Sequence, residues 1–454
     1  MDQLTNIVTE ANSFIWGLYC LIPLLCGTGL YFTLKLQGVQ VRKFWTGIKY
    51  TFGGFNLFGK RADKDGMSSF QALATAIAGQ VGTGNLAGAA TAIAAGGPGA
   101  IFWMWIAAFL GMGTIFAEAC LAQIFKQKTA DGRVVGGPAY YISEGLHCHW
   151  LACFFSVACI IALGWVGNMV QSNSIADACY NAFGTNRLMI GVLVAGLGAY
   201  VFFGGVGRIA SVTEKMVPIM AFGYLLGGAI ILIRFADQII PAFHMIFVGA
   251  FNPQAAFGGL IGVTMKEAIR YGVARGLFSN EAGMGSTPHA HAVAKVNMPA
   301  EQGFVAIVSV FIDTFLVLNM TAFVIFVTGV IDTKLSGIAL TQAAFQIGLG
   351  SFGIPFVAIC MFFFAFSTVI GWYFYGEQNI IFLFGEKGLL PYRVIAICFI
   401  AAGSVLKLDL VWQLADFFNG IMVFPNLIAV LFLGKYVTKA LNDYDEKHQL
   451  KAAK

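Results

Sequence analysis

Residues 79–85 read Gly79-Gln80-Val81-Gly82-Thr83-Gly84-Asn85 and lie inside an apolar stretch that runs from 68 to 96. Each of the three glycines makes a helix less stable than alanine would, by up to about 1 kcal/mol. Inside a bilayer, non-helical backbone persists only where it is buried in protein or lines a cavity. The run therefore predicts a membrane helix that is interrupted at a functional position.

A second run of the same character is Gly276-Leu277-Phe278-Ser279-Asn280-Glu281-Ala282-Gly283-Met284-Gly285. Either run alone is more typical of a close contact between two helices. Two runs separated by five predicted spans favour interrupted helices at matching positions of two inverted halves.

The composition requires a membrane. Of the 454 residues, 58% are hydrophobic and 11% are charged, whereas soluble proteins carry roughly 25% charged residues. The nine cysteines show no zinc-ligand spacing. The six histidines form no ligand set, so the sequence argues against a membrane-embedded enzyme.

Apolar runs of about 20 residues are long enough to cross a bilayer as helices. Reading for them predicts an all-α membrane protein with about eleven transmembrane helices, at 13–34, 68–96, 99–125, 150–180, 187–206, 212–234, 255–288, 302–330, 351–384, 391–407 and 410–434. We expect one additional N-terminal helix and a core of five plus five helices in inverted repeat.

Lysine and arginine collect on the cytoplasmic side of membrane proteins. The segment before the first span has none, and the loop after it has several, from Lys35 to Lys64. We therefore expect the N-terminus outside and the C-terminus in the cytoplasm. The predicted divisions are an N-terminal helix and cytoplasmic loop (1–67), a first inverted repeat (68–234), a second inverted repeat (235–435) and a cytoplasmic tail (436–454).

An interrupted helix frees backbone N–H groups at one end of the break and carbonyl groups at the other. The N–H groups and the helix dipole suit a carboxylate, and the carbonyls suit a sodium ion or an ammonium group. A zwitterionic amino acid offers both charges at short spacing. No row of lysine or arginine lines the spans, which argues against anionic substrates.

Val81-Gly82-Thr83-Gly84-Asn85 resembles the break in the first core helix of sodium-coupled transporters with the LeuT fold. Gly136-Gly137-Pro138-Ala139-Tyr140-Tyr141-Ile142, after Asp131-Gly132-Arg133, and the run from Gly276 to Ser286 closely resemble the alanine or glycine:cation symporter family. The resemblance covers about residues 60–435. It implies a LeuT-type fold and sodium-coupled symport of alanine or glycine across a prokaryotic plasma membrane.

The resemblance also implies roles for residues. The carbonyls of Ala78 and Val81 and the hydroxyls of Ser367 and Thr368 would bind one sodium ion. Gln80 and Asn85 lie where some relatives have a second sodium site. The amides near Gly82, Thr83 and Gly84 would meet the substrate carboxylate. The residues expected to line the substrate pocket besides these are Gln171, Asn280, Gly283, Thr368 and Trp372.

Three acids lie within apolar stretches. Glu281, in the second run, is either a functional carboxylate or a helix cap. Asp313 is expected to pair with Lys266, Arg270 or Arg275, because an unpaired charge in a membrane is costly. Glu118 is expected to be solvated near a cytoplasmic helix end.

Three other functions were weighed. A channel would repeat pore-lining groups, which this chain does not do. An enzyme lacks a reactive cluster. A proton-coupled small amino-acid symporter is the alternative, with Glu281 as its titratable group. We expect lipid and a small amino acid as the partners, no nucleic acid, and a monomer, with an oligomer left open.

Overall fold

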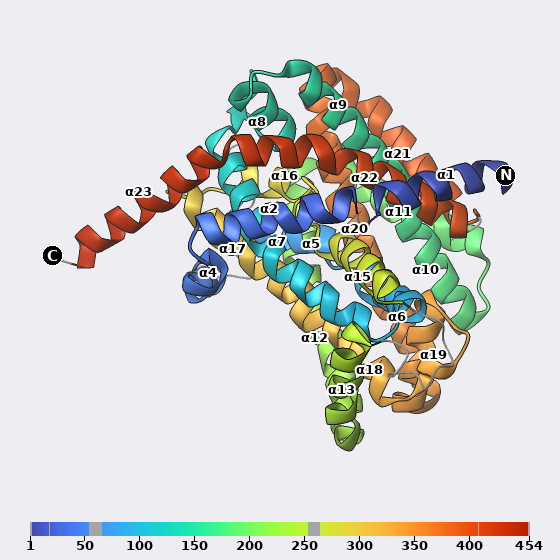
Figure 1. The fold of residues 1–454 in the computed structure, drawn as a ribbon. Helices are drawn as coiled ribbons and strands as arrows, with labels where there is room; N and C mark the ends of the chain where they lie inside the picture. The colour runs from blue at the N-terminus through green and yellow to red at the C-terminus, as the bar shows by residue number, and fades with distance from the viewer. Residues whose placement is uncertain (1, 18, 54–65, 253–263, 407, 453–454) are drawn as a thin grey trace.

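The computed structural model describes residues 2–17, 19–53, 66–252, 264–406 and 408–452, and almost all of them are helical (Figure 1). A short hairpin of β1 (Gln127–Lys128) and β2 (Val134–Val135) is antiparallel, with Gln127 opposite Val135. The all-helical membrane fold predicted from the sequence is confirmed.

The N-terminal part and the first half contain α1 (Asp2–Ile15), α2 (Leu21–Lys35), α3 (Val39–Arg42), α4 (Phe44–Phe52), α5 (Ser69–Gln80), the π-helical turn η1 (Gly84–Gly88), α6 (Ala89–Gly96), α7 (Gly99–Ile124), α8 (Pro138–Gly145), α9 (His149–Cys159), the π-helical stretch η2 (Ile160–Gly167), α10 (Asn168–Phe183), α11 (Arg187–Phe202) and α12 (Gly205–Arg234).

The remainder contains η3 (Ala236–Gln238), α13 (Ile239–Phe251), α15 (Met265–Asn280), α16 (Pro288–Ala292), α17 (Pro299–Val310), the π-helical stretch η4 (Phe311–Leu318), α18 (Asn319–Val327), η5 (Val330–Asp332), α19 (Gly337–Leu349), η6 (Gly350–Phe352), α20 (Gly353–Phe384), η7 (Gly385–Gly388), α21 (Leu389–Gly403), α22 (Leu408–Phe432) and α23 (Gly434–Ala452).

Six helical runs in the described part are long and apolar enough to cross a bilayer, and three further apolar helices are shorter. Most lie close to the predicted spans. The count of eleven spans, the four predicted divisions and the side on which each terminus lies stay predictions. Residues 255–263 of the predicted seventh span lie outside the described residues.

The helices that were not predicted include α13, α19 and α23. The first two have only 13 residues each, which is too short to be read as a full span. The predicted tail is helical because Val437, Leu441 and Tyr444 form one buried apolar stripe. Helix α23 begins against α7 and α17, and its far end extends away from the body of the molecule (Figure 1).

The first predicted break is present. Helix α5 ends at Gln80, Val81 has extended backbone dihedral angles, and helical geometry resumes at Thr83. Ser68 caps the start of α5 by accepting a hydrogen bond from the Gln71 amide, while the Gln71 side chain accepts one from the Ser68 amide. The interruption is therefore local, in the middle of an otherwise well-formed helix.

The second predicted break is longer. Helix α15 ends at Asn280, and α16 begins only at Pro288. Within the break, Glu281, Gly283 and Gly285 all have positive φ angles, of 58°, 88° and 82°. Glycine adopts such angles without steric cost, which explains why two of the three are glycine.

The two breaks lie against each other. A Cβ atom on Gly84 would stand 2.9 Å from Ser279 Cα, and η1 also packs on η4. Helix α20 closes the other side, because a Cβ on Gly371 would stand 2.8 Å from the Gly79 amide nitrogen. Small residues thus bring four backbone segments to one buried place, as small residues do between membrane helices.

Candidate functional site

A group of oxygen atoms lies where α5 is interrupted. The Thr368 hydroxyl, on α20, lies 2.9 Å from the Ala78 carbonyl oxygen and 3.4 Å from that of Val81. Ala78 belongs to the last turn of α5 and Val81 directly follows it, so the break leaves both carbonyls without their usual helical partners. The structure therefore brings together three of the four residues predicted to bind the first sodium ion.

The fourth of these residues, Ser367, points elsewhere. Its hydroxyl donates to the Phe364 carbonyl at 2.7 Å and lies 3.5 Å from the Met220 sulfur on α12. Neighbouring residues on a helix face directions about 100° apart. Ser367 and Thr368 therefore cannot both direct their hydroxyls to the same carbonyls without a change of rotamer.

A buried carboxylate connects the two breaks. Asp313 is 0% exposed and accepts hydrogen bonds from Asn85 Nδ2 at 2.7 Å, from the Ser279 hydroxyl at 3.0 Å and from the Thr314 hydroxyl at 2.9 Å. We call these four residues the Asp313 cluster. Asn85 belongs to the first break, Ser279 precedes the second, and Asp313 lies on η4 between them.

The predicted basic partner of Asp313 is wrong. Arg275 instead forms a two-pronged ion pair with Asp416 of α22, at 2.8 and 2.7 Å. Arg275 lies one helical turn before Ser279 on α15, and its side chain points toward α22. No lysine or arginine in the described part of the chain forms an ion pair with Asp313, so its three neutral polar neighbours leave its negative charge uncompensated.

Gln80 and Asn280 form a second link between the breaks. Gln80 Nε2 donates to the Asn280 carbonyl at 2.7 Å, and Asn280 Nδ2 donates to the Thr314 hydroxyl at 3.2 Å. Asn85 therefore belongs to the Asp313 cluster directly, whereas Gln80 reaches it only through Asn280. The structure separates the two residues that were predicted as one second sodium site.

The residues predicted to meet the substrate carboxylate adjoin Gln171 of α10. Gln171 Oε1 accepts a hydrogen bond from the Thr83 amide at 3.3 Å, and the Gly82 amide donates to Asn85 Oδ1 at 2.9 Å. A Cβ on Gly82 would stand 2.2 Å from the Thr368 hydroxyl oxygen. Gly82, Thr83, Gln171 and Thr368 are thus neighbours.

Trp372 closes one end of this region. Its indole N–H donates to Glu281, and its ring contacts Phe278 edge-on at 5.7 Å between centroids. A Cβ on Gly167 would stand 2.5 Å from the same ring. Glu281 also accepts from the Ser286 hydroxyl at 2.7 Å. Trp372 is therefore fixed from three sides, by η2, by α15 and by the second break.

Gly283 lies apart from the other predicted pocket residues. Its amide donates to Glu118 at 3.0 Å, as does that of Gly285, and its carbonyl accepts from Asn426. The expectation that Glu118 is solvated is wrong, since Glu118 is 0% exposed. The second break frees these amides, and a carboxylate on α7 satisfies them as a cap would.

Several buried polar atoms near the first break have no partner among the described residues. They are Gln80 Oε1, Thr83 Oγ1, Asn168 Oδ1 and Ser172 Oγ. Buried polar atoms normally have a hydrogen-bond partner, so unpaired ones mark a place where a ligand or water completes the bonding. These atoms supply both acceptors and hydroxyl donors, which is what a zwitterion needs.

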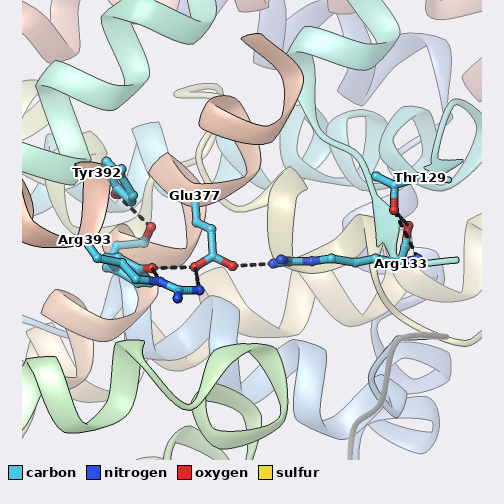
Figure 2. A network of polar contacts seen from close by, with 6 residues as sticks. Thr129, Arg133, Glu377, Tyr392 and Arg393 are labelled. Carbon is cyan, nitrogen blue, oxygen red and sulfur yellow. Dashed lines mark hydrogen bonds and ion pairs between the residues drawn. The ribbon is translucent and has the colours of Figure 1, made fainter. Parts of the chain in front are cut away.

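A separate ionic group lies near the far end of α20 (Figure 2). Glu377, 0% exposed, accepts from Arg133 of the loop beside β2, lies 3.8 Å from Arg393 of α21, and accepts from the Tyr373 hydroxyl at 2.5 Å. We call Arg133, Tyr373, Glu377 and Arg393 the Glu377 cluster. It ties the loop beside β2 to helices α20 and α21 through one carboxylate, and Arg133 is 244 residues from Glu377 along the chain.

Sequence reasoning did not single out Ser279, Thr314 or the role of Glu118. Each is a common residue in an apolar or glycine-rich stretch, with no motif of its own. The available signal was position, because Ser279 lies within the second run and Thr314 directly follows Asp313.

The long apolar helices, the two interruptions and the polar residues gathered between them define a helical membrane transporter. Among solved structures, that of a manganese transporter mutant from Eremococcus coleocola has a similar fold, with a TM-score of 0.53 and 16% identity over 81% of this chain and 78% of that one. At this identity the similarity concerns the fold alone.

The chain belongs to the sodium:alanine symporter family, whose model matches residues 1–454. It is 43% identical to the sodium/alanine symporter AgcS of Methanococcus maripaludis, over 96% of this chain and 97% of that protein. It is 41% identical to YrbD of Bacillus subtilis, named a putative sodium/proton-dependent alanine carrier protein, over 98% of this chain and 93% of that one. The chain is thus a transporter, not an enzyme, in a family of cation-coupled amino-acid symporters.

Proposed function

We propose that this protein carries small neutral amino acids, alanine and glycine, into a prokaryotic cell together with sodium ions, as a multi-pass protein of the plasma membrane with its N-terminus outside and its C-terminus in the cytoplasm. The observation that carries the proposal is the unpaired carboxylate of Asp313 beside a helix break that exposes carbonyl oxygens. A negative charge in such a place calls for a cation. The family membership supports an amino acid as the co-transported solute.

The first sodium ion is assigned to the carbonyls of Ala78 and Val81 and the Thr368 hydroxyl, because freed carbonyls and hydroxyls are the ligands that broken membrane helices offer to sodium. The second is assigned to the Asp313 cluster. Its carboxylate and the hydroxyls of Ser279 and Thr314 supply hard oxygen ligands.

The substrate is assigned to the space beside Thr83, Gly84 and Gln171. The backbone amides that open the second half of the broken helix would hold its carboxylate. Unpaired acceptors such as Gln80 Oε1 and Asn168 Oδ1 suit its ammonium group. Trp372 and Phe278 would limit the size of its side chain.

Two cavities support alternating access. One, of about 270 Å³, includes Arg275 and Trp412 and lies on the predicted outer side. The other, of about 570 Å³, includes Arg133 and Arg393 on the predicted inner side. Arg275 is paired with Asp416 in the first and Arg133 with Glu377 in the second, so an ion pair adjoins each approach to the site.

We expect uptake of labelled alanine into liposomes to require sodium and to rise with an inside-negative potential. One net positive charge moved through 100 mV supplies about 2.3 kcal/mol, which sustains roughly a 40-fold gradient of a neutral substrate. The measurement compares sodium with choline at fixed pH and potential. Equal uptake in the two salts would refute sodium coupling.

The alternative is a proton-coupled symporter. The observation that favours it is the buried carboxylate of Glu281, whose hydrogen-bond partners among the described residues are the Trp372 indole and the Ser286 hydroxyl. In that case a pH gradient would drive uptake in choline as well as in sodium, so the same liposomes separate the two mechanisms.

A further prediction distinguishes the role of the Thr368 hydroxyl from that of the adjacent Ser367 hydroxyl. Replacing Thr368 by valine keeps the shape of the side chain. It removes the hydroxyl that donates to the carbonyls of Ala78 and Val81. We expect the sodium concentration for half-maximal uptake to rise about tenfold or more, since a bond to a charged group contributes roughly 1.5–3 kcal/mol. Ser367→Ala should shift it much less, because the Ser367 hydroxyl is bonded to the Phe364 carbonyl and contacts the Met220 sulfur, and bonds to neither carbonyl of the break. Equal shifts in both variants would contradict this assignment.

A further inference from the structure

Helix α22 carries a buried asparagine with no partner. Asn419 is 1% exposed, and neither its Nδ2 nor its Oδ1 has a hydrogen-bond partner among the described residues. A side-chain amide offers two N–H donors and an acceptor oxygen. In Asn419 both polar atoms are unpaired, whereas the amide nitrogens of two other buried asparagines are bonded: Asn173 donates to the carbonyls of Gly403 and Leu406, and Asn426 donates to Glu118 and the Gly283 carbonyl.

Asn419 lies on the face of α22 that meets α15 and the second break. Trp412 and Asn426 are seven residues before and after it, which is nearly two helical turns, so the three side chains share one face. Trp412 packs on Phe278 at 5.0 Å between ring centroids, and Asn426 contacts Gly283. Asn419 lies between these contacts along the helix, level with the residues that follow Phe278.

The same helix also packs against η2, which ends at Gly167. Gly167 touches the Trp372 ring, whose indole nitrogen reaches Glu281 in the second break. Asn419 therefore belongs to the Trp372 end of the region between the breaks. The amides of Thr83 and Gly84, assigned to the substrate carboxylate, belong to the other break.

We infer that Asn419 hydrogen-bonds the side chain of the transported amino acid, and that the transporter therefore prefers small substrates bearing a hydroxyl or a carboxamide over apolar ones of equal size. This inference rests on the proposed function and names the substrate class of the same site. A site with an unpaired buried amide rejects an apolar isostere, because the amide then stays unsatisfied. A hydroxyl or carboxamide can both donate to Oδ1 and accept from Nδ2.

The test uses two competitors of nearly equal size. Liposomes containing the full chain take up labelled alanine under a sodium gradient, and unlabelled L-serine or L-2-aminobutyrate is added. These competitors differ in a hydroxyl against a methyl group. We expect serine to inhibit at a concentration about tenfold lower than aminobutyrate, the size of effect that one hydrogen bond to a substrate gives.

In Asn419→Leu we expect that ratio to fall to about one, because leucine has a similar shape and no polar atoms. Asn12→Leu is the matched control. Asn12 is also buried, and its amide nitrogen donates to the carbonyl and side-chain oxygens of Gln413 on α22. It should keep the preference for serine. Thermal stabilisation of the purified variants by each competitor gives a second reading that does not need transport.

Equal inhibition by serine and aminobutyrate in the unmodified protein would overturn the inference, and so would a serine preference that survives in Asn419→Leu. In either case water, and not the substrate, would be the hydrogen-bond partner of the Asn419 amide. These outcomes differ from failure of the proposed function, in which alanine uptake shows no dependence on sodium at all.

Discussion

Asp313→Asn is expected to abolish sodium-driven alanine uptake at physiological sodium concentrations. The substitution keeps the size of the side chain and most of its hydrogen bonds to Asn85, Ser279 and Thr314, and it removes the charge. At 4 Å and an effective dielectric constant of 20, two unit charges attract by about 4 kcal/mol. The sodium concentration for half-maximal uptake should therefore rise roughly a thousandfold.

The measurement is the sodium dependence of uptake, and of alanine binding, in protein that elutes as a single species. Asp237→Asn is the matched control, because Asp237 is an exposed acid on η3 that accepts a hydrogen bond from the neighbouring Gln238. It should not change the sodium dependence. An unchanged sodium requirement in Asp313→Asn would remove the Asp313 cluster from the ion site.

The second large effect is expected for Gly84→Ala. The added methyl would stand 2.9 Å from Ser279 Cα and 3.1 Å from Ser279 Cβ. The first of these atoms is backbone, so the two breaks would have to separate. Overpacking of this kind typically costs about 1–3 kcal/mol. If the cost falls on the ligand-bound arrangement, alanine affinity drops roughly 5- to 150-fold.

Alanine binding to purified Gly84→Ala is measured by calorimetry. Gly196→Ala on α11 is the control, since a Cβ there would meet nothing within 4 Å. Gly99 would be a poor control, because a Cβ there would stand 2.2 Å from the Gly249 carbonyl oxygen. Unaltered alanine binding in Gly84→Ala would mean that the substrate does not depend on the contact between the breaks.

The sequence predicted both interruptions because glycine content and membrane depth are local properties. The contact of Thr368 with Ala78 and Val81 was also anticipated, through the resemblance. Which acidic residue pairs with which basic residue could not be predicted from the sequence. Arg275 lies one helical turn before Ser279, which bonds to Asp313, yet it pairs with Asp416, which lies 141 residues away along the chain.

Burial of Glu118 was missed for a related reason. Its position near the end of a predicted span suggests solvent, and only the three-dimensional course of the second break places the free amides of Gly283 and Gly285 beside it. Asn419 was missed for a similar reason. Its lack of a hydrogen-bond partner among the described residues depends on the positions of its neighbours in space, and no sequence pattern predicts these.

The Glu377 cluster has a consequence for how sequences of this kind can change over time. Arg133, Glu377 and Arg393 come from a loop and two helices. The negative charge of Glu377 and the positive charges of the two arginines compensate one another. Loss of one partner of a buried ion pair typically costs about 3–5 kcal/mol, so a single replacement is tolerated poorly. Among diverging descendants of this chain, the three positions should therefore vary together, and a neutral residue at 377 should accompany the loss of arginine at 133.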